Sequence, residues 1–154
     1  MIGATLSISE LKDDLPNFKE FVYYNAQIRD ISPYDNVEKQ FSKGLERLKS
    51  WLLLYNHSVC WHPYTNKINQ YNPYFANLET NQKIFCLSVL IILFQVFGDG
   101  NHRTAYYFYE RKTGVPLSDE LKIKINKFHS FNEFSMINLN QEFIEKILSI
   151  SHIK

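Results

Sequence analysis

Apolar residues recur with a helical period in the first half of the chain. In the segment that begins at Asp35 they are spaced at steps of four, four, three, four and three residues, which places them on one face of a helix. Charged side chains fall on the other side, where they are expected to be solvated: Lys39, Lys43, Glu46, Arg47 and Lys49. The pattern predicts a long amphipathic helix, whose apolar face consists of Val37, Phe41, Leu45, Leu48, Leu52 and Tyr55.

A second helix is predicted from Leu78 to Phe97, with Thr80 as its N-cap. Its most apolar part, residues 85–97, contains 13 residues. A transmembrane helix needs about 20. A helix that is apolar on every side is normally surrounded by other protein. We therefore expect this helix at the centre of the fold, and we expect no membrane span.

Shorter helices are predicted around these two. Capping residues, prolines and apolar spacing place four of them at Ser7–Leu15, Asn17–Asp30, Asn101–Lys112 and Ser118–Phe128. A last helix begins near Asn138 or Gln141. Its apolar face consists of Phe143, Ile144, Ile147 and Ile150. Residues 57–75 are rich in Asn, Pro and Tyr and lack a helical period, which indicates a loop or a short hairpin. The sequence thus predicts one all-α domain, residues 1–154, with at most one short β-hairpin.

Charge argues against one class of function. Lys and Arg number 17 and Asp and Glu 16, so the net charge of +1 lacks the basic character typical of DNA-binding proteins. The turn after Phe97, between two predicted helices, raises a helix-turn-helix DNA-binding protein as an alternative. Near-neutral charge and a very apolar first helix count against it. We therefore expect no DNA partner.

Cys60 and Cys86 lie far apart and belong to no recognised metal-ligand motif. We expect both to be reduced thiols inside the protein, as is usual in a reducing compartment. The N-terminal segment has no basic region followed by an apolar one, so no classical secretory signal is expected. The expected location is the cytoplasm, or a host cytosol reached by a non-classical route.

The stretch FQVFGDGNHRTAYY, which begins at Phe94, contains the candidate chemistry. A buried helix runs into a turn with Gly98 and Gly100, and a second helix begins with polar residues. Backbone N–H groups at a helix N-terminus attract anions, and glycines let a phosphate approach the backbone. Arg103 can add a bidentate contact to phosphate oxygens, and Asp99 can hold a divalent cation. The alternative is a plain connection, in which the arginine pairs with a carboxylate and the aspartate caps the helix.

The order of residues in this stretch resembles the signature of the Fic/Doc (Fido) family, His-x-Phe-x-Asp-Gly-Asn-(Gly or Lys)-Arg-Thr. The resemblance covers Leu78 to Gly114, about a quarter of the chain, because an apolar helix precedes the motif and an aromatic helix follows it. It implies the mainly helical Fido fold. Six positions match at their required spacing: Phe97, Asp99, Gly100, Asn101, Arg103 and Thr104.

The resemblance implies a site for ATP or a related nucleotide together with Mg²⁺. A phosphoryl or AMP group would pass to a Ser, Thr or Tyr hydroxyl of a target protein, and an antitoxin or a host protein would be a further partner. A β-hairpin flap that aligns the target would fall at residues 61–71, which an ordinary surface loop explains equally well. In this site Asp99 would bind the metal and Phe97 would anchor the loop. The phosphates would be bound by Gly98, Gly100, Asn101 and His102. The remaining nucleotide contacts would come from Arg103 and Thr104.

Three positions depart from the family pattern. Gln95 stands where the family has the catalytic histidine, and a neutral amide cannot take the proton of a target hydroxyl. His102 stands where Gly or Lys is usual, and it is a candidate for a phosphate donor, an exposed side chain or a substitute base. Tyr106 replaces a second arginine of Fic nucleotidyl transferases, which favours Doc-like phosphoryl transfer.

Two functional hypotheses follow from these departures. In the first, the chain is a Fido-type transferase whose catalysis is impaired by Gln95. In the second, it is a catalytically inactive Fic-like module that acts by binding another protein, as an effector or antagonist. Both keep a mainly helical fold, and they differ in whether a group is transferred.

Overall fold

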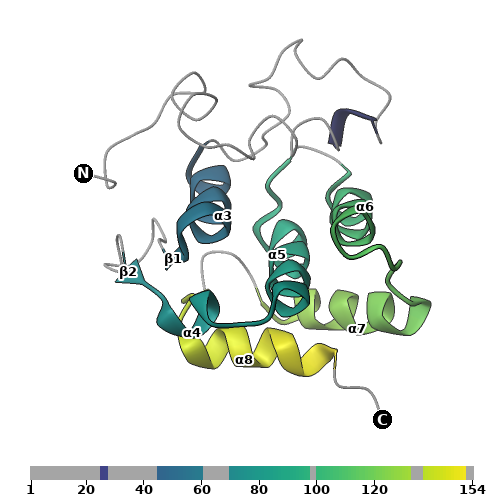
Figure 1. Cartoon of the computed structure of the whole chain (residues 1–154). Helices are drawn as coiled ribbons and strands as arrows, with labels where there is room; N and C mark the ends of the chain where they lie inside the picture. The colour runs from purple at the N-terminus through teal and green to yellow at the C-terminus, as the bar shows by residue number, and fades with distance from the viewer. Residues whose placement is uncertain (1–24, 28–44, 61–69, 98–99, 133–136, 152–154) are drawn as a thin grey trace.

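The computed structural model describes residues 25–27, 45–60, 70–97, 100–132 and 137–151 (Figure 1). The helix predicted at Ser7–Leu15, the start of the helix predicted from Asp35, and most of the proposed flap lie outside this range. Of the helix predicted at Asn17–Asp30, residues 25–27 are described, and they are helical.

The described part of the chain is mainly helical, with one small antiparallel sheet. The two strands pair Val59 with Tyr71 and Cys60 with Gln70, so of the two alternatives predicted for residues 57–75 the short hairpin is the one observed. The expectation of an all-α fold with one short hairpin is therefore confirmed. The elements are α3 (Leu45–His57), β1 (Val59–Cys60), β2 (Gln70–Tyr71), α4 (Pro73–Ala76), α5 (Thr80–Phe94), α6 (Asn101–Thr113), α7 (Asp119–Ser130) and α8 (Gln141–Ile150).

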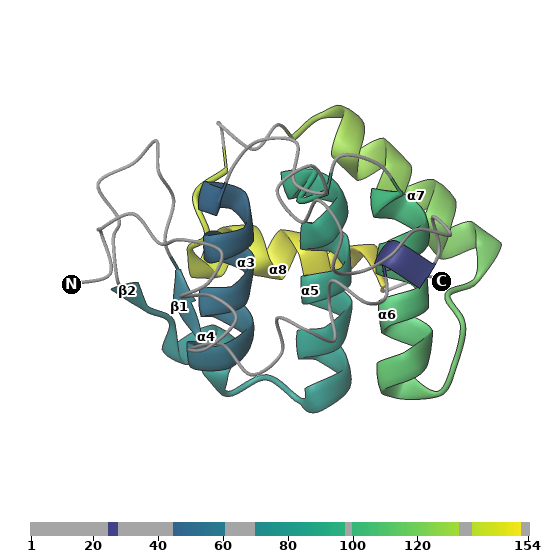
Figure 2. The same cartoon turned by 90° about the horizontal axis from the view of Figure 1, so that it is seen from above.

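Helix α5 is the centre of the core, as its apolar sequence predicts. Every residue from Ile84 to Phe94 is buried, and the helix contacts α3, α6, α7 and α8. Helices α3, α5 and α6 lie side by side, while α7 and α8 pack across one end of them (Figures 1 and 2). Among the described residues, no helix is long and apolar enough to cross a membrane.

Trp51 packs α3 against the central helix α5. Its indole N–H donates to the carbonyl of Leu87 at 2.8 Å, and its ring makes edge-on contacts with Tyr55 and Phe108. The side chain is completely buried. An aromatic ring of this size contributes a large apolar area to the core, and its one polar group is satisfied there.

The charged face predicted for α3 is wrong at two positions. Lys49 is buried, with 3% of its surface exposed, and Arg47 is partly buried. The Arg47 guanidinium donates to the carbonyl of Phe94 at 2.8 Å. The last carbonyls of a helix have no partner within it, so a long cationic side chain from α3 is well suited to bind the end of α5.

Several helix ends differ from the predicted ones. The N-cap of α5 is Glu79 rather than Thr80, because Glu79 and Gln82 form a reciprocal capping box. Asn140 caps α8, through a 2.9 Å bond from the amide of Phe143 to its side-chain oxygen. The end of α6 agrees with the prediction, since Gly114 adopts the left-handed conformation, with φ of 79°.

Both cysteines are free and buried, which confirms the expectation of internal thiols. Burial raises the pKa of Cys60 to about 11, partly offset by a hydrogen bond from Asn72. Burial also raises the pKa of Cys86, and the nearby Cys60 adds to the effect. Both side chains therefore stay protonated at neutral pH and are poor nucleophiles.

Candidate functional site

The turn between α5 and α6 begins earlier than the apolar run suggests. Helix α5 ends at Phe94, and Gln95 takes the left-handed conformation with φ of 51° and ψ of 56°. That conformation costs a residue with a side chain roughly 1–2 kcal/mol. The Gln95 side chain offsets part of this cost by donating from its Nε2 to the carbonyl of Ile92 at 2.8 Å. A glutamine, rather than a glycine, thus ends the central helix.

Asn101 holds the turn closed from the start of α6. Its Oδ1 accepts from the amide of Phe97 at 2.9 Å, and its Nδ2 donates to the carbonyl of the same residue at 2.9 Å. The same Nδ2 donates to the Gln95 Oε1 at 3.3 Å. Asn101 is 5% exposed, so these bonds form away from bulk water. Because an amide is both donor and acceptor, an aspartate or a leucine cannot make this set of bonds.

Two motif residues beside Asn101 have the burial and backbone conformation that were predicted for them. Phe97 is 1% exposed and anchors the turn in the core. Gly100 has φ of 75° and is the N-cap of α6, where its carbonyl accepts from the amide of Thr104 at 2.9 Å. Gly98 and Asp99 lie outside the described residues, so their roles with phosphate and metal remain predictions.

Thr104 faces the interior rather than an open site. It is completely buried, and its hydroxyl accepts from Asn25 Nδ2 at 3.0 Å. Asn25 belongs to the helical segment 25–27, which lies beside α6 in both views (Figures 1 and 2). The partner is 79 positions away in sequence, and no local pattern identified it.

The imidazole of His102 lies against α7. Its ring centroid is 5.8 Å from that of His129 and 6.3 Å from that of Tyr106, and its side chain is hydrogen-bonded to Asn126. Burial lowers the pKa of His102, the nearby His129 lowers it further, and the bond to Asn126 acts in the opposite direction. Burial likewise lowers the pKa of His129. The pair is therefore largely neutral at pH 7, and a role for His102 as base or phosphate donor remains a prediction.

Arg103 is exposed and lies on the face of α6 that is turned away from the core. It lines a hollow of about 330 Å³ together with Glu110 and with residues of α6, α7 and their connection. Within the described ranges no ion pair joins Arg103 to Glu110, although both line this hollow. The motif residues within α6 therefore lie on two faces of the helix: Asn101 and Thr104 are buried, and Arg103 is exposed.

Of the described residues, no group of three or more His, Cys, Asp and Glu side chains is gathered to hold a metal ion. The proposed metal ligand, Asp99, lies outside the described residues. A Mg²⁺ site with one carboxylate and phosphate oxygens needs no such cluster, because Mg²⁺ keeps several water ligands.

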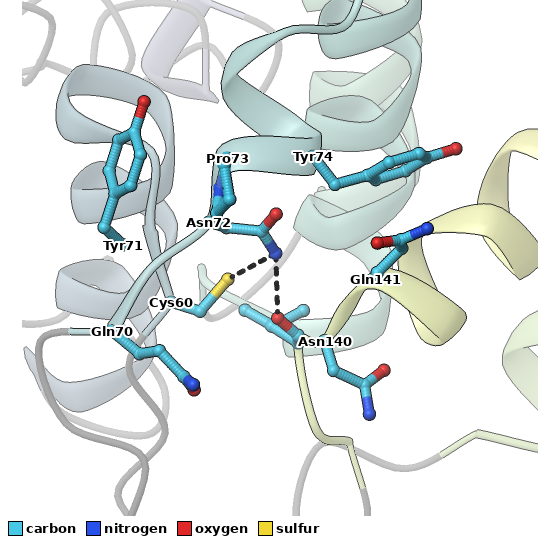
Figure 3. Close-up of a pocket in the computed structure, with 9 residues that line it drawn as sticks. Cys60, Gln70, Tyr71, Asn72, Pro73, Tyr74, Asn140 and Gln141 are labelled. Atoms are coloured by element: carbon cyan, nitrogen blue, oxygen red, sulfur yellow. Dashed lines mark hydrogen bonds between the residues drawn. The ribbon is translucent and has the colours of Figure 1, made fainter.

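A separate hollow of about 170 Å³ lies between the hairpin, α4 and the start of α8 (Figure 3). Asn72 is central to it: its Nδ2 donates to Cys60 Sγ and to the Leu139 carbonyl, both at 3.3 Å. Its Oδ1 accepts from the Phe75 amide at 2.9 Å. This amide joins three segments of the chain, and none of the predicted site residues lines the hollow.

Comparison with protein-family models, with curated proteins and with solved structures finds no match to this chain.

Proposed function

We propose that this chain is a Fic/Doc-like protein that binds the phosphates of ATP or a related nucleotide at the turn between α5 and α6. Asp99 would bind Mg²⁺, and a phosphoryl or AMP group would pass from ATP to a hydroxyl of another protein, with ADP or pyrophosphate as the respective leaving group. Gln95 impairs that transfer. The observation that carries the proposal is the Asn101 clamp: Asn101 fixes Phe97 and Gln95 directly before the glycine N-cap of α6.

The start of α6 has the electrostatic character that a phosphate site needs. Gly100 has no side chain with which to cap the helix, and no acidic residue occupies the first turn. The first N–H groups of a helix carry partial positive charge and lack partners within the helix. They are therefore suited to bind an anion, and the left-handed Gly100 lets the anion approach the backbone.

The proposal implies slow transfer, because Gln95 cannot act as a general base. A target hydroxyl that attacks a nucleotide phosphate must lose its proton, and the resemblance assigns this step to the side chain at Gln95. An amide has no titratable nitrogen near neutral pH. Loss of a positioned general base lowers a rate by about 10² to 10⁴. Binding and transfer are thus separable in this chain.

The second candidate function is an inactive module that binds an antitoxin or a host protein. One observation favours it: both polar ends of the Gln95 amide are used within the turn. Its Nε2 donates to the Ile92 carbonyl and its Oε1 accepts from Asn101. A side chain engaged in this way contributes to the structure of the turn and does not need to contact a substrate.

Calorimetric titration of the whole chain with ATP and Mg²⁺ tests the proposal. We expect binding in the wild-type chain and loss of it in Asn101→Asp, which cannot donate to the Phe97 carbonyl and so disturbs the turn that would hold the phosphate. Arg103→Ala should weaken binding by about tenfold to a hundredfold if the arginine contacts phosphate. The matched control is Arg111→Ala, which removes the same charge from an exposed position in the last turn of α6.

Absence of ATP binding at millimolar concentration, in a chain that is folded by circular dichroism, would refute the phosphate site. The second candidate would then stand alone. Equal weakening in Arg103→Ala and Arg111→Ala would show a general effect of charge and no direct contact from Arg103.

A further inference from the structure

The outer face of α6 borders the hollow that Arg103 lines, and Arg103 is the one lining residue that the nucleotide proposal also uses. We call it the outer hollow. It has a volume of about 330 Å³, in the size range of small-ligand sites. One wall is α6 and the other is the connection to α7 with the first turns of that helix. Its residues are Arg103, Tyr106, Tyr107, Glu110, Pro116, Leu117 and Lys122.

Two cationic groups from different helices border the outer hollow. Arg103 comes from the first turn of α6, and among the described residues neither an ion pair nor a hydrogen bond engages its guanidinium. Lys122 comes from α7, and its Nζ lies 4.9 Å from the centre of the Tyr106 ring. That cation–π contact keeps the ammonium at the wall of the hollow. Glu110 provides the single opposing carboxylate among the lining residues.

The remaining lining is aromatic and apolar. Tyr106 and Tyr107 present rings from α6, and Pro116 and the buried Leu117 present aliphatic surface from the connection. Burial raises the pKa of Tyr106, so its hydroxyl stays protonated and can donate a hydrogen bond. Flat apolar walls beside two cations suit a ligand that has a planar ring and a negative charge.

We propose that the outer hollow binds a phosphate monoester attached to a planar ring, with the phosphate between Arg103 and Lys122 and the ring against Tyr106, Tyr107 and Leu117. A phosphotyrosine side chain and a nucleoside monophosphate share this chemistry. Arg103 is shared with the proposed function, but the site needs neither the turn between α5 and α6 nor Mg²⁺. Titration without Mg²⁺ and a variant of Lys122 therefore test it separately from the proposed function.

Phenyl phosphate is the smallest probe that has both features. We would titrate the full chain with it in the absence of Mg²⁺ and follow amide signals by two-dimensional NMR. Changes should concentrate at residues 103–110 and 116–122. Inorganic phosphate and phenol, the two halves of the probe, should each bind more weakly than phenyl phosphate. Absence of saturable changes in these segments would overturn the proposal, as would phenol binding as tightly as phenyl phosphate.

Two variants test the charges without relying on Arg103, which the nucleotide proposal also uses. Lys122→Gln should weaken phenyl phosphate binding about tenfold or more, because it removes a charge-assisted contact. Lys127→Gln, at an exposed position of the same helix that does not line the hollow, is the matched control and should change affinity less than about twofold. Equal effects of the two substitutions would overturn the assignment of Lys122.

Glu110→Gln gives a prediction of opposite sign. Removal of the carboxylate that repels the phosphate should tighten binding by about two- to fivefold. A substitution that only disturbed the fold would weaken binding, so this variant tests the proposal even if Lys122→Gln fails to fold. Unchanged or weaker binding in folded Glu110→Gln would contradict it. Parallel titrations with O-phosphotyrosine and AMP then distinguish the two sources of the ligand. The probe that binds more tightly shows whether the site prefers a phosphotyrosine side chain or a nucleoside monophosphate.

Discussion

The two faces of α6 use the same motif in different ways. On the inner face, Asn101 and Thr104 are buried, and their polar groups bond to Phe97, Gln95 and Asn25. On the outer face, Arg103 is exposed and borders an open hollow. The residues that resemble the family motif thus include some that build the turn and one, Arg103, that lines an open hollow. The predictions below test where that division lies.

The largest expected effect is on catalysis at the inner face. Gln95→His should raise the rate of transfer from labelled ATP to protein by about 10² to 10⁴, the contribution of a positioned general base. Histidine tolerates the left-handed conformation better than most residues, and a pKa near 6.5 leaves it able to accept a proton. The measurement follows label on the chain itself or in a lysate, with Mg²⁺ present.

The outcomes of that assay separate the two candidate functions. Equal, robust activity in both forms would show that Gln95 is not at the reactive position. Binding of nucleotide by both forms without activity in either would favour the inactive module. Asn101→Asp in the Gln95→His background is the control, since it should abolish any gained activity by disturbing the turn that Asn101 holds in place.

The next effect is on stability. Asn101→Ala should lower the free energy of unfolding by about 2–4 kcal/mol, because it leaves the buried N–H and carbonyl of Phe97 without the partner that the side chain provides. Arg103→Ala, two residues away on the exposed face, should change it by less than about 0.5 kcal/mol. Urea unfolding monitored by tryptophan fluorescence measures both. Similar losses in the two variants would remove the distinction between inner and outer faces.

A smaller effect is expected where the inner face meets segment 25–27. Thr104→Val keeps the shape of the side chain and removes the oxygen that accepts from Asn25, at a cost of about 1–2 kcal/mol. Thr104→Ser keeps the hydroxyl and should be less destabilising than Thr104→Val. The reverse order in urea unfolding would mean that the buried methyl group, and not the hydrogen bond, is what the site requires.

The smallest effect is a dependence on pH where α6 meets α7. Burial lowers the pKa of His102 and of His129, so the unfolded chain binds more protons than the folded one below about pH 6.5. The stabilisation is present above that pH and is lost as the pH falls through the folded-state values. Unfolding measured from pH 7.5 to pH 5 should show a decline that is shallower in the double variant His102→Gln, His129→Gln. If the free energy of unfolding fell as steeply with pH in the double variant as in the wild-type chain, the two histidines would not be the cause of the decline.

Local sequence signals predicted most of the helices. The apolar run before Phe97 identified the buried central helix, and Thr113-Gly114 marked the end of α6, because each depends on a short stretch of chain. The end of α5 was placed too late, since Gln95 takes a conformation more typical of glycine and asparagine. The bond from Asn101 to Phe97 explains how the apolar residues beyond Gln95 stay buried without being helical.

Contacts across the chain were the part that sequence did not reveal. Arg47 and Lys49 fit a solvated face by period alone, and only the position of α3 against α5 explains why they are covered. Asn25 and Asn72 have no motif around them, yet each binds segments distant in sequence. The orientation of His102 toward His129 and of Arg103 toward the outer hollow likewise depends on where α7 packs.

The enclosure of α5 has a consequence for how the protein is made. A ribosome releases this helix before α6, α7 and α8, the partners that cover most of its surface. Until those residues emerge, the most apolar segment of the chain has only α3 and earlier residues to shield it. The nascent chain is then at its most prone to aggregation. A transcript cut short after residue 97 should yield an insoluble product. In full-length synthesis, at roughly 5–20 residues per second, the helices that pack against α5 follow within seconds.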